Sequence, residues 1–361
     1  MVRVKYRNRV APGLIGQTGT RFCAVCFCLT LALAVLPAQA SDKDRLEKHG
    51  LPSGSHPAYG GAGSQRQDAQ GLSHYIMGLY CENLGDIDGS IQEYLKALAR
   101  DPGSSLLHLN LASSFIKKND AAKAIDQLKQ ASNLAPEAVE PHLVLALVYA
   151  AGNNPDLATN EYALALKNAT KLDPKNIELY KSLGVIYLQQ NKKKEAEGIF
   201  KLIVGMAPND AQVRFYLGSI YYDSKDYAAA EKELKAALKL KPDYHEALNF
   251  LGYAYLERDK EINRAGGLIK KALSFEPENG AYIDSLGWYY FKKGKFKEAV
   301  EKLEKAASCL SDPVIYEHLG DVYLKLGNEE NAKLNWDKSL KLDVSQEKVK
   351  EKLQKIINNG K

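Results

Sequence analysis

The amino-acid sequence repeats itself with a period of about 34 residues, and this periodicity restricts the possible folds more than any other feature. Successive prolines lie 34, 38, 34, 34 and 35 residues apart, at Pro102, Pro136, Pro174, Pro208, Pro242 and Pro277. A fixed period of this length is typical of a linear array, in which each repeat packs mainly against its two neighbours. The array occupies the chain from about residue 71 onward, which leaves no space for a separate catalytic domain.

Two series of mostly small residues indicate where helices approach one another within each repeat. The first series is Gly78, Ala112, Ala146, Gly184, Gly218, Gly252, Gly287 and Gly320, and the second is Ala97, Ala131, Ala169, Ile203, Ala237, Ala272, Ala306 and Ser339. Small side chains let two antiparallel helices pack closely, while larger neighbours fill the space beside them. The proline after the second helix ends it, because proline lacks an amide hydrogen. The pattern of small residues and prolines therefore predicts a helical hairpin in each repeat, and the fold is expected to be all-α.

The sequence resembles the tetratricopeptide repeat (TPR) family over residues 71–346. The Leu-Gly-x-x-Tyr pattern of that family stands at residues 183–187, with close copies at 217–221, 251–255, 286–290 and 319–323. The family's second-helix pattern of alanine, aromatic residue and proline matches Ala196, Phe200 and Pro208. The resemblance implies a right-handed superhelical solenoid of about eight helix-turn-helix repeats, closed by a C-terminal capping helix.

The register of the repeats predicts the domain boundaries. Eight repeats are expected at 71–104, 105–138, 139–176, 177–210, 211–244, 245–279, 280–312 and 313–346. The third repeat carries about four extra residues before Lys171, and the sixth carries one extra residue around Glu257–Arg264. Residues 347–361 are expected to form the capping helix, since a terminal repeat needs a polar outer face. Residues 41–70 are rich in glycine, serine and glutamine and predict a flexible linker.

Residues 1–40 have the pattern of an export signal. A basic stretch ends at Arg21, an uncharged apolar run follows at 22–36, and Ala38-Gln39-Ala40 fits the site that a signal peptidase recognises. The apolar run has about 15 residues, fewer than the roughly 20 that a helix needs to cross a bilayer. We therefore expect a signal peptide cleaved after Ala40, with an uncleaved anchor as the alternative, and only transient membrane contact. The predicted location is the periplasm or cell envelope, with secretion also possible.

The charge of the chain gives no support to a nucleic-acid partner. The sequence has 49 basic and 44 acidic residues, and five of the basic ones lie in residues 1–40, which contain no acidic residue. The rest of the chain therefore has 44 side chains of each sign. Without an excess of positive charge there is no electrostatic footprint for nucleic acid.

The side chains that could carry chemistry do not form a recognisable site. His74, His108 and His142 recur at the repeat spacing, but equivalent atoms of adjacent repeats lie on the order of 10 Å apart. Ligands to one ion need bonds of about 2.1 Å, so packing is the preferred interpretation. The sequence contains no glycine-rich phosphate loop, nucleophile elbow or Cys-x-x-Cys pair. We expect no enzyme activity, no cofactor, no metal and no small-molecule substrate, and no disulfide between Cys81 and Cys309.

The resemblance places the first helix of each repeat on the concave side, with roughly its second, fifth, ninth and twelfth positions pointing inward. The candidate partner-binding residues at these positions are Phe215, Tyr222, Asn249, Tyr253, Asp284, Trp288, Phe291, Glu317 and Asp321. Aromatic anchors beside hydrogen-bonding groups are typical of peptide-binding surfaces. The acidic members favour a basic or neutral segment. An alternative stays open, in which Trp288 and Phe291 only fill the tight inner curve.

The expected function is that of a non-enzymatic protein–protein interaction scaffold or adaptor in the bacterial cell envelope. Residues 248–343 are similar to envelope TPR proteins, including adaptors of carboxy-terminal processing proteases, in the stretches 280–288 and 312–321. Lys181 matches one position of the family's clamp for a terminal carboxylate, but Val185 replaces its asparagine, so carboxylate capture is not expected. The alternatives are a self-assembling homo-oligomeric scaffold, or an accessory subunit of an envelope protease, secretion or pilus machinery.

Overall fold

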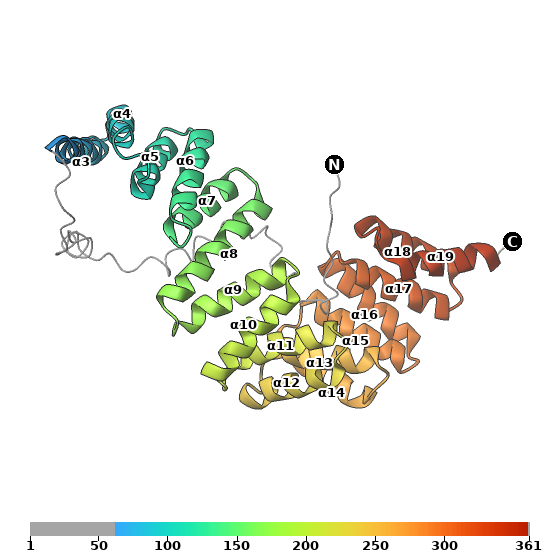
Figure 1. Cartoon of the computed structure of the whole chain (residues 1–361). Coiled ribbons are helices and arrows are strands. Elements are labelled where there is room, and N and C mark those ends of the chain that lie inside the picture. Colours follow the sequence, from blue (N-terminus) through green and yellow to red (C-terminus); the bar gives the residue numbers. More distant parts are fainter. Residues whose placement is uncertain (1–61, 360–361) are drawn as a thin grey trace. The chain divides into compact units, whose positions relative to one another are not determined.

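The computed structural model describes residues 62–359, and every regular element in this range is an α-helix, as predicted (Figure 1). The helices divide into two compact units, which we describe separately. The N-terminal unit ends at Gln189 and contains α3 (Ala62–Asn83), α4 (Ile87–Leu98), α5 (Ser105–Lys117), α6 (Ala121–Leu134), α7 (Glu140–Ala151), α8 (Pro155–Leu172) and α9 (Ile177–Gln189).

The C-terminal unit begins at Gln190 and contains the remaining helices. They are α10 (Lys193–Met206), α11 (Ala211–Asp223), α12 (Tyr227–Leu240), α13 (His245–Glu257), α14 (Ile262–Phe275), α15 (Gly280–Lys292), α16 (Phe296–Cys309), α17 (Pro313–Lys325), α18 (Glu329–Leu342) and α19 (Glu347–Asn359). Apart from α9 and α10, which belong to different units, each odd-numbered helix from α3 to α17 is the first helix of a hairpin, and the even-numbered helix that follows is the second. Each second helix that shares a unit with the next first helix packs against it.

The turns inside the hairpins follow from two local preferences. Asn119 in the second hairpin has a φ of 62° and Gly294 in the seventh has a φ of 71°, in the left-handed region that asparagine and glycine tolerate best. The side chain of Asp120 then accepts a hydrogen bond from the Lys123 amide, and Asp226 accepts one from Ala229. Such caps satisfy amides at the start of the second helix that have no partner within the helix.

The small residues of the first series allow the two helices of a hairpin to approach closely. A Cβ atom built on Gly287 would lie 2.6 Å from Leu303, and one on Gly320 would lie 2.3 Å from the ring of Trp336. Distances this short leave no room for a side chain on the first helix. The predicted role of the small residues in helix packing is therefore seen directly at both positions.

The predicted linker 41–70 is wrong at its C-terminal end, because α3 begins at Ala62 rather than at Gly71. The stretch 62–70 has no proline and contains alanine, glutamine and arginine, which favour helix once a helix has been nucleated downstream.

The four extra residues of the third repeat lengthen α8 to 18 residues, against 14 in α6 and α10. The extra residue of the sixth repeat lies in the turn before α14, where Asp259 and Glu261 both have positive φ.

Several features bear on the remaining expectations. The predicted signal peptide and the linker up to residue 61 lie outside the described residues. Within residues 62–359, no helix is both long enough and apolar enough to span a bilayer.

Cys81 and Cys309 are free thiols. Cys81 is partly buried, whereas Cys309 is exposed at the end of α16.

Candidate partner-binding face of the C-terminal unit

The first helices of the C-terminal unit bring the predicted site residues into one layer, which we call the candidate face. Four of the nine are buried and five are half-buried. Phe215, Asn249, Asp284 and Trp288 are at most 7% exposed, while Tyr222, Tyr253, Phe291, Glu317 and Asp321 keep part of their surface in contact with solvent. The four buried residues support the face from beneath and offer almost no surface to a partner. The other five remain the predicted contact residues.

Trp288 is fixed by contacts on several sides. Its ring stacks on Phe291, with centroids 4.5 Å apart, and on His318, with centroids 4.0 Å apart. Its indole nitrogen donates a hydrogen bond of 2.8 Å to Glu257. Burial of a tryptophan normally requires such a partner for its N–H group. The alternative that Trp288 fills the inner curve therefore describes its position better than direct contact does.

A buried ion pair lies beside this ring. His318 on α17 donates a hydrogen bond from Nδ1 to the Asp284 carboxylate on α15 across 2.9 Å, and Asp284 is fully buried. Among the described residues, neither Oδ2 of Asp284 nor Oδ1 of Asn249 has a hydrogen-bond partner. Buried oxygens of this kind usually bind water or a ligand donor. The layer thus combines stacked rings with acceptors that point into the protein.

Burial alone would lower the pKa of His318, but the nearby carboxylates, Asp284 first and then Glu257 and Glu317, together outweigh it and raise the pKa above 6.5. The folded state therefore binds this proton more tightly than the unfolded state does. The resulting stability is fully present below about pH 6.5 and is lost as the pH rises through the folded pKa.

This shift predicts a measurable pH dependence. The free energy of unfolding of the wild type minus that of His318→Gln should be largest near pH 6 and should decrease toward pH 9, because only the wild type loses the bound proton. Urea unfolding at a series of pH values measures this difference. A difference that is constant or rises with pH would contradict the assigned direction.

The acidic end of the candidate face already has a counterion. Lys352 on α19 donates hydrogen bonds to Glu317, at 2.9 Å, and to both oxygens of Asp321, at 2.6 and 2.7 Å. Burial raises the pKa of Asp321, although Lys352 opposes that effect. Of the basic or neutral segments expected as partners, the basic ones are no longer favoured by these carboxylates, since Lys352 of the chain's own terminal helix neutralises much of their charge.

Three residues important to this layer were absent from the sequence-based set: His318, Glu257 and Lys352. His318 stands at the register position of Phe250, two repeats earlier, and follows Asp284 by 34 residues, about the length of one repeat. That spacing was a usable signal for a pair between adjacent first helices. Lys352 had no such signal, because nothing in the repeat register indicates which side of the capping helix meets α17.

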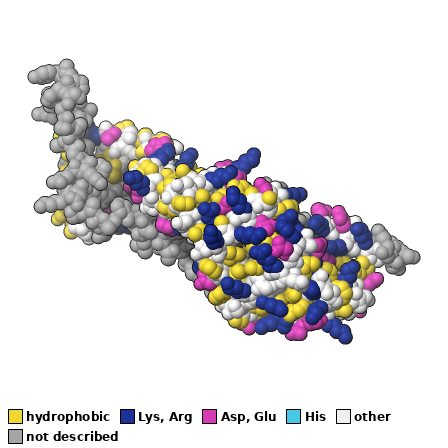
Figure 2. Space-filling model, turned by 90° about the horizontal axis from the view of Figure 1, so that it is seen from below, with side chains coloured by type: hydrophobic (Ala, Val, Ile, Leu, Met, Phe, Trp, Pro, Cys, Tyr) yellow, Lys and Arg dark blue, Asp and Glu magenta, His cyan; other side chains and the backbone are white. Residues whose placement is uncertain are grey.

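The histidines that recur at the repeat spacing each have a partner within their own repeat. No group of three or more His, Cys, Asp or Glu side chains in the described part of the chain could hold a metal ion. His74, His108 and His142 each form a hydrogen bond with a residue 19 positions later, on the second helix of the same repeat. They are therefore packing residues of their own repeats. On the face seen in Figure 2, basic and acidic side chains are interspersed.

Comparison with known proteins decides the family. Sequence profiles described as tetratricopeptide repeat match residues 73–104, 109–177, 161–214, 214–280 and 314–343. The chain belongs to the tetratricopeptide repeat family. TPR proteins as a group bind other proteins, so the chain has the fold of a protein–protein interaction scaffold.

Similar proteins and structures agree with this assignment. The chain is 27% identical over 218 residues to a TPR repeat-containing protein of Pseudomonas aeruginosa, covering 59% of this chain and 36% of that one. A solved tetratricopeptide repeat protein of Parabacteroides merdae superimposes with a TM-score of 0.53 at 18% identity, over 69% of this chain and 97% of the other. The Cut9–Hcn1 assembly of the APC/C gives a TM-score of 0.52 at 16% identity, over 74% and 52%.

These similarities establish the fold class, an all-α TPR superhelix. The chain spans 25–48% of the length of three curated relatives that it matches, including the Pseudomonas protein. What those longer proteins do as a whole is therefore no guide to the activity of this chain.

Proposed function

We propose that this TPR protein is a non-enzymatic scaffold whose candidate face binds a segment of a partner polypeptide. The observation that carries the proposal is the row of half-buried aromatic residues Tyr222, Tyr253 and Phe291, which all pack on one core cluster. Half-buried aromatic side chains are the residues that most often dominate binding energy at protein interfaces, because they add large contact area at little entropic cost.

The layer beneath these rings supports the proposal by holding them in place. Phe291 stacks on the buried Trp288, and Tyr222 lies edge-on to the buried Phe250 with ring centroids 5.5 Å apart. Tyr253 lies 6.2 Å from the buried His318 ring. A contact surface that is ordered before binding loses less entropy when the partner arrives.

The charges narrow the chemistry of the partner. Burial raises the pKa of the Tyr253 hydroxyl well above 10, and the nearby Glu257 and Asp284 raise it further, so this hydroxyl is neutral and able to donate. Glu317 and Asp321 are paired with Lys352. The preferred guest is an extended segment with apolar side chains and little net charge, with backbone carbonyls that can accept from Tyr253.

Alanine variants test the proposed face. Tyr253→Ala and Phe291→Ala should each weaken retention of the captured partner by about 5–30-fold, the factor that 1–2 kcal/mol of an aromatic anchor represents. The assay is capture from an extract of the source cells, followed by titration of the retained protein. Leu334→Ala on α18 is the matched control, because Leu334 is 50% exposed on a second helix. Equal retention of the partner by all three variants would contradict the proposal that the candidate face binds it.

We further propose that the scaffold works in the cell envelope after export. The support is the N-terminal pattern of basic residues, apolar run and Ala38-Gln39-Ala40. Mass spectrometry of the protein from fractionated cells should find Ser41 as the first residue in the envelope fraction. An intact N-terminus in the cytoplasmic fraction would overturn this part of the proposal.

A further inference from the structure

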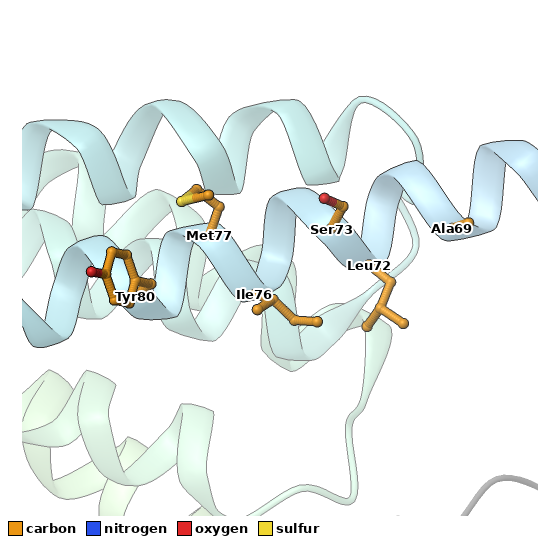
Figure 3. Close-up of a pocket in the computed structure, with 6 residues that line it drawn as sticks. All are labelled: Ala69, Leu72, Ser73, Ile76, Met77 and Tyr80. Atoms are coloured by element: carbon orange, nitrogen blue, oxygen red, sulfur yellow. The ribbon is translucent and has the colours of Figure 1, made fainter.

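The first helix of the array has an apolar side that nothing in the described chain covers. Ala69, Leu72, Ser73, Ile76, Met77 and Tyr80 of α3 line a shallow pocket on its surface (Figure 3). Leu72, Ile76 and Tyr80 are each 57–58% exposed, and Met77 is 48% exposed. A contiguous exposed group of large apolar side chains is uncommon on soluble proteins and marks an interaction surface.

The later repeats show what this side of a first helix normally contacts. The residues in the register position of Met77 are Leu111, Leu145, Leu183, Leu217, Leu251, Leu286 and Leu319, and each is at most 7% exposed. Leu111 packs with Ile91, Tyr94 and Ala97 of the preceding second helix, and Leu319 packs with the corresponding residues of α16. Among the described helices, none precedes α3 to cover the same position. The uncovered side is thus shaped to receive another helix.

The uncovered side carries no charge. From Ala69 to Leu84 the exposed residues are Ala69, Gln70, Leu72, Ser73, Ile76, Met77, Leu79, Tyr80, Asn83 and Leu84. Not one of them is ionisable at neutral pH, in a chain in which 26% of residues are charged. The nearby Glu82 is paired with Lys117, and His74 with Glu93. Covering this side would therefore bury no unpaired charge, the cost that usually opposes association.

The absence of charge on this side of α3 favours one kind of binding partner. An acidic or basic peptide would find no ion pair on this surface, and anionic lipid headgroups would find no basic residue. A second copy of the same surface presents matching uncharged side chains. The other end of the array does not, because Val349 and Ile356 of α19 are already buried against Trp336, and Glu347, Lys348, Glu351 and Lys355 are exposed.

We propose that the α3 surfaces of two copies pack against each other in a two-fold dimer. Leu72, Ile76 and Tyr80 are four residues apart and form one ridge along the helix, while Ala69, Ser73 and Met77 form a neighbouring row of mostly smaller side chains. Figure 3 shows Leu72 and Ile76 projecting to one side of α3 and Ser73 and Met77 to the other. The ridge of one copy fits the row of the other in the packing that is commonest between helices.

A two-fold contact uses the same surface on both copies and is therefore complete at two. The array then grows neither into a filament nor into a lattice, which narrows the self-assembling alternative considered for this sequence. The proposal uses a surface in the N-terminal unit and does not depend on the candidate face of the C-terminal unit.

Analytical ultracentrifugation of the full purified chain over about 1–200 µM tests the dimer. We expect a concentration-dependent dimer for the wild type and a monomer for Ile76→Glu, because the two carboxylates would face each other across the interface. Leu202→Glu is the matched control, since Leu202 is 47% exposed on α10, and it should dimerise like the wild type. Far-UV circular dichroism must show the same helix content for all three proteins.

Three outcomes would overturn the proposal. The first is a wild-type chain that stays monomeric over the whole range. The second is a loss of the dimer that is equal in Ile76→Glu and Leu202→Glu. The third is a monomer whose α3 surface binds zwitterionic lipid vesicles, which would assign the surface to a membrane instead of a second copy.

Discussion

Replacing Trp288 by alanine should lower the free energy of unfolding of the C-terminal unit by about 3–5 kcal/mol, the usual cost of truncating a buried tryptophan. The variant loses the stacking contacts with Phe291 and His318 and leaves Glu257 without the indole donor. It also opens a cavity beside the buried Asp284–His318 pair. Each of these changes lowers the free energy of unfolding.

Urea unfolding followed by circular dichroism measures the effect of Trp288→Ala. Trp288→Phe should lose less, about 1–2 kcal/mol, because the ring contacts survive and one hydrogen bond is lost. Leu334→Ala, at an exposed site, should change little. A loss below about 1 kcal/mol for Trp288→Ala would show that the tryptophan is a contact residue at the surface. That result would favour the interpretation in which Trp288 binds a partner over the one in which it fills the inner curve.

Replacing Lys352 by glutamate should detach α19 and lower the free energy of unfolding by about 2–4 kcal/mol, somewhat less than breaking a fully buried ion pair. The new carboxylate would face Glu317 and Asp321, and the three side chains are only 18–28% exposed at present. With like charges so close, the buried contact of Val349 and Ile356 with Trp336 can no longer hold the helix in place.

Hydrogen exchange of the α19 amides is the sharpest measurement of this change. Lys352→Glu should remove most of their protection, whereas Lys355→Glu, which alters an exposed lysine of the same helix, should leave it intact. Lowering the pH should partly rescue Lys352→Glu, because the pKa of Asp321 is raised by burial and protonation removes one of the facing charges. Equal loss of protection in both variants would mean that helix propensity, and not the ion pair, holds α19.

The helix hairpins were predictable because they rest on local and periodic signals. Proline and the small residues recur with the repeat, and the first helices begin at Ser105, Ile177, Ala211, His245, Gly280 and Pro313, at the starts that the register indicates. The extension of α3 to Ala62 was missed because its sequence is polar, and polar composition alone does not distinguish a linker from the exposed end of a helix.

The division between buried and exposed residues in the candidate face was much less predictable. The inward positions of the first helices follow from the register, but the burial of Trp288 and Asn249 depends on how tightly neighbouring repeats curve. That curvature arises from many contacts between helices, such as the close approach of Gly266 to Tyr289. The pairing of Lys352 with Asp321 depends on the docking of α19, which has no repeat partner from which it could be inferred.

Photo-crosslinking in cells tests the central claim that the candidate face holds a partner polypeptide. A benzophenone amino acid would replace Phe291 or Tyr253 on the face, and Leu334 on α18 as the reference. We predict that the two face positions capture the same discrete protein and that the Leu334 position does not. Capture of the same proteins with equal yield at all three positions, or no capture at Phe291 and Tyr253 in a folded protein, would contradict the account.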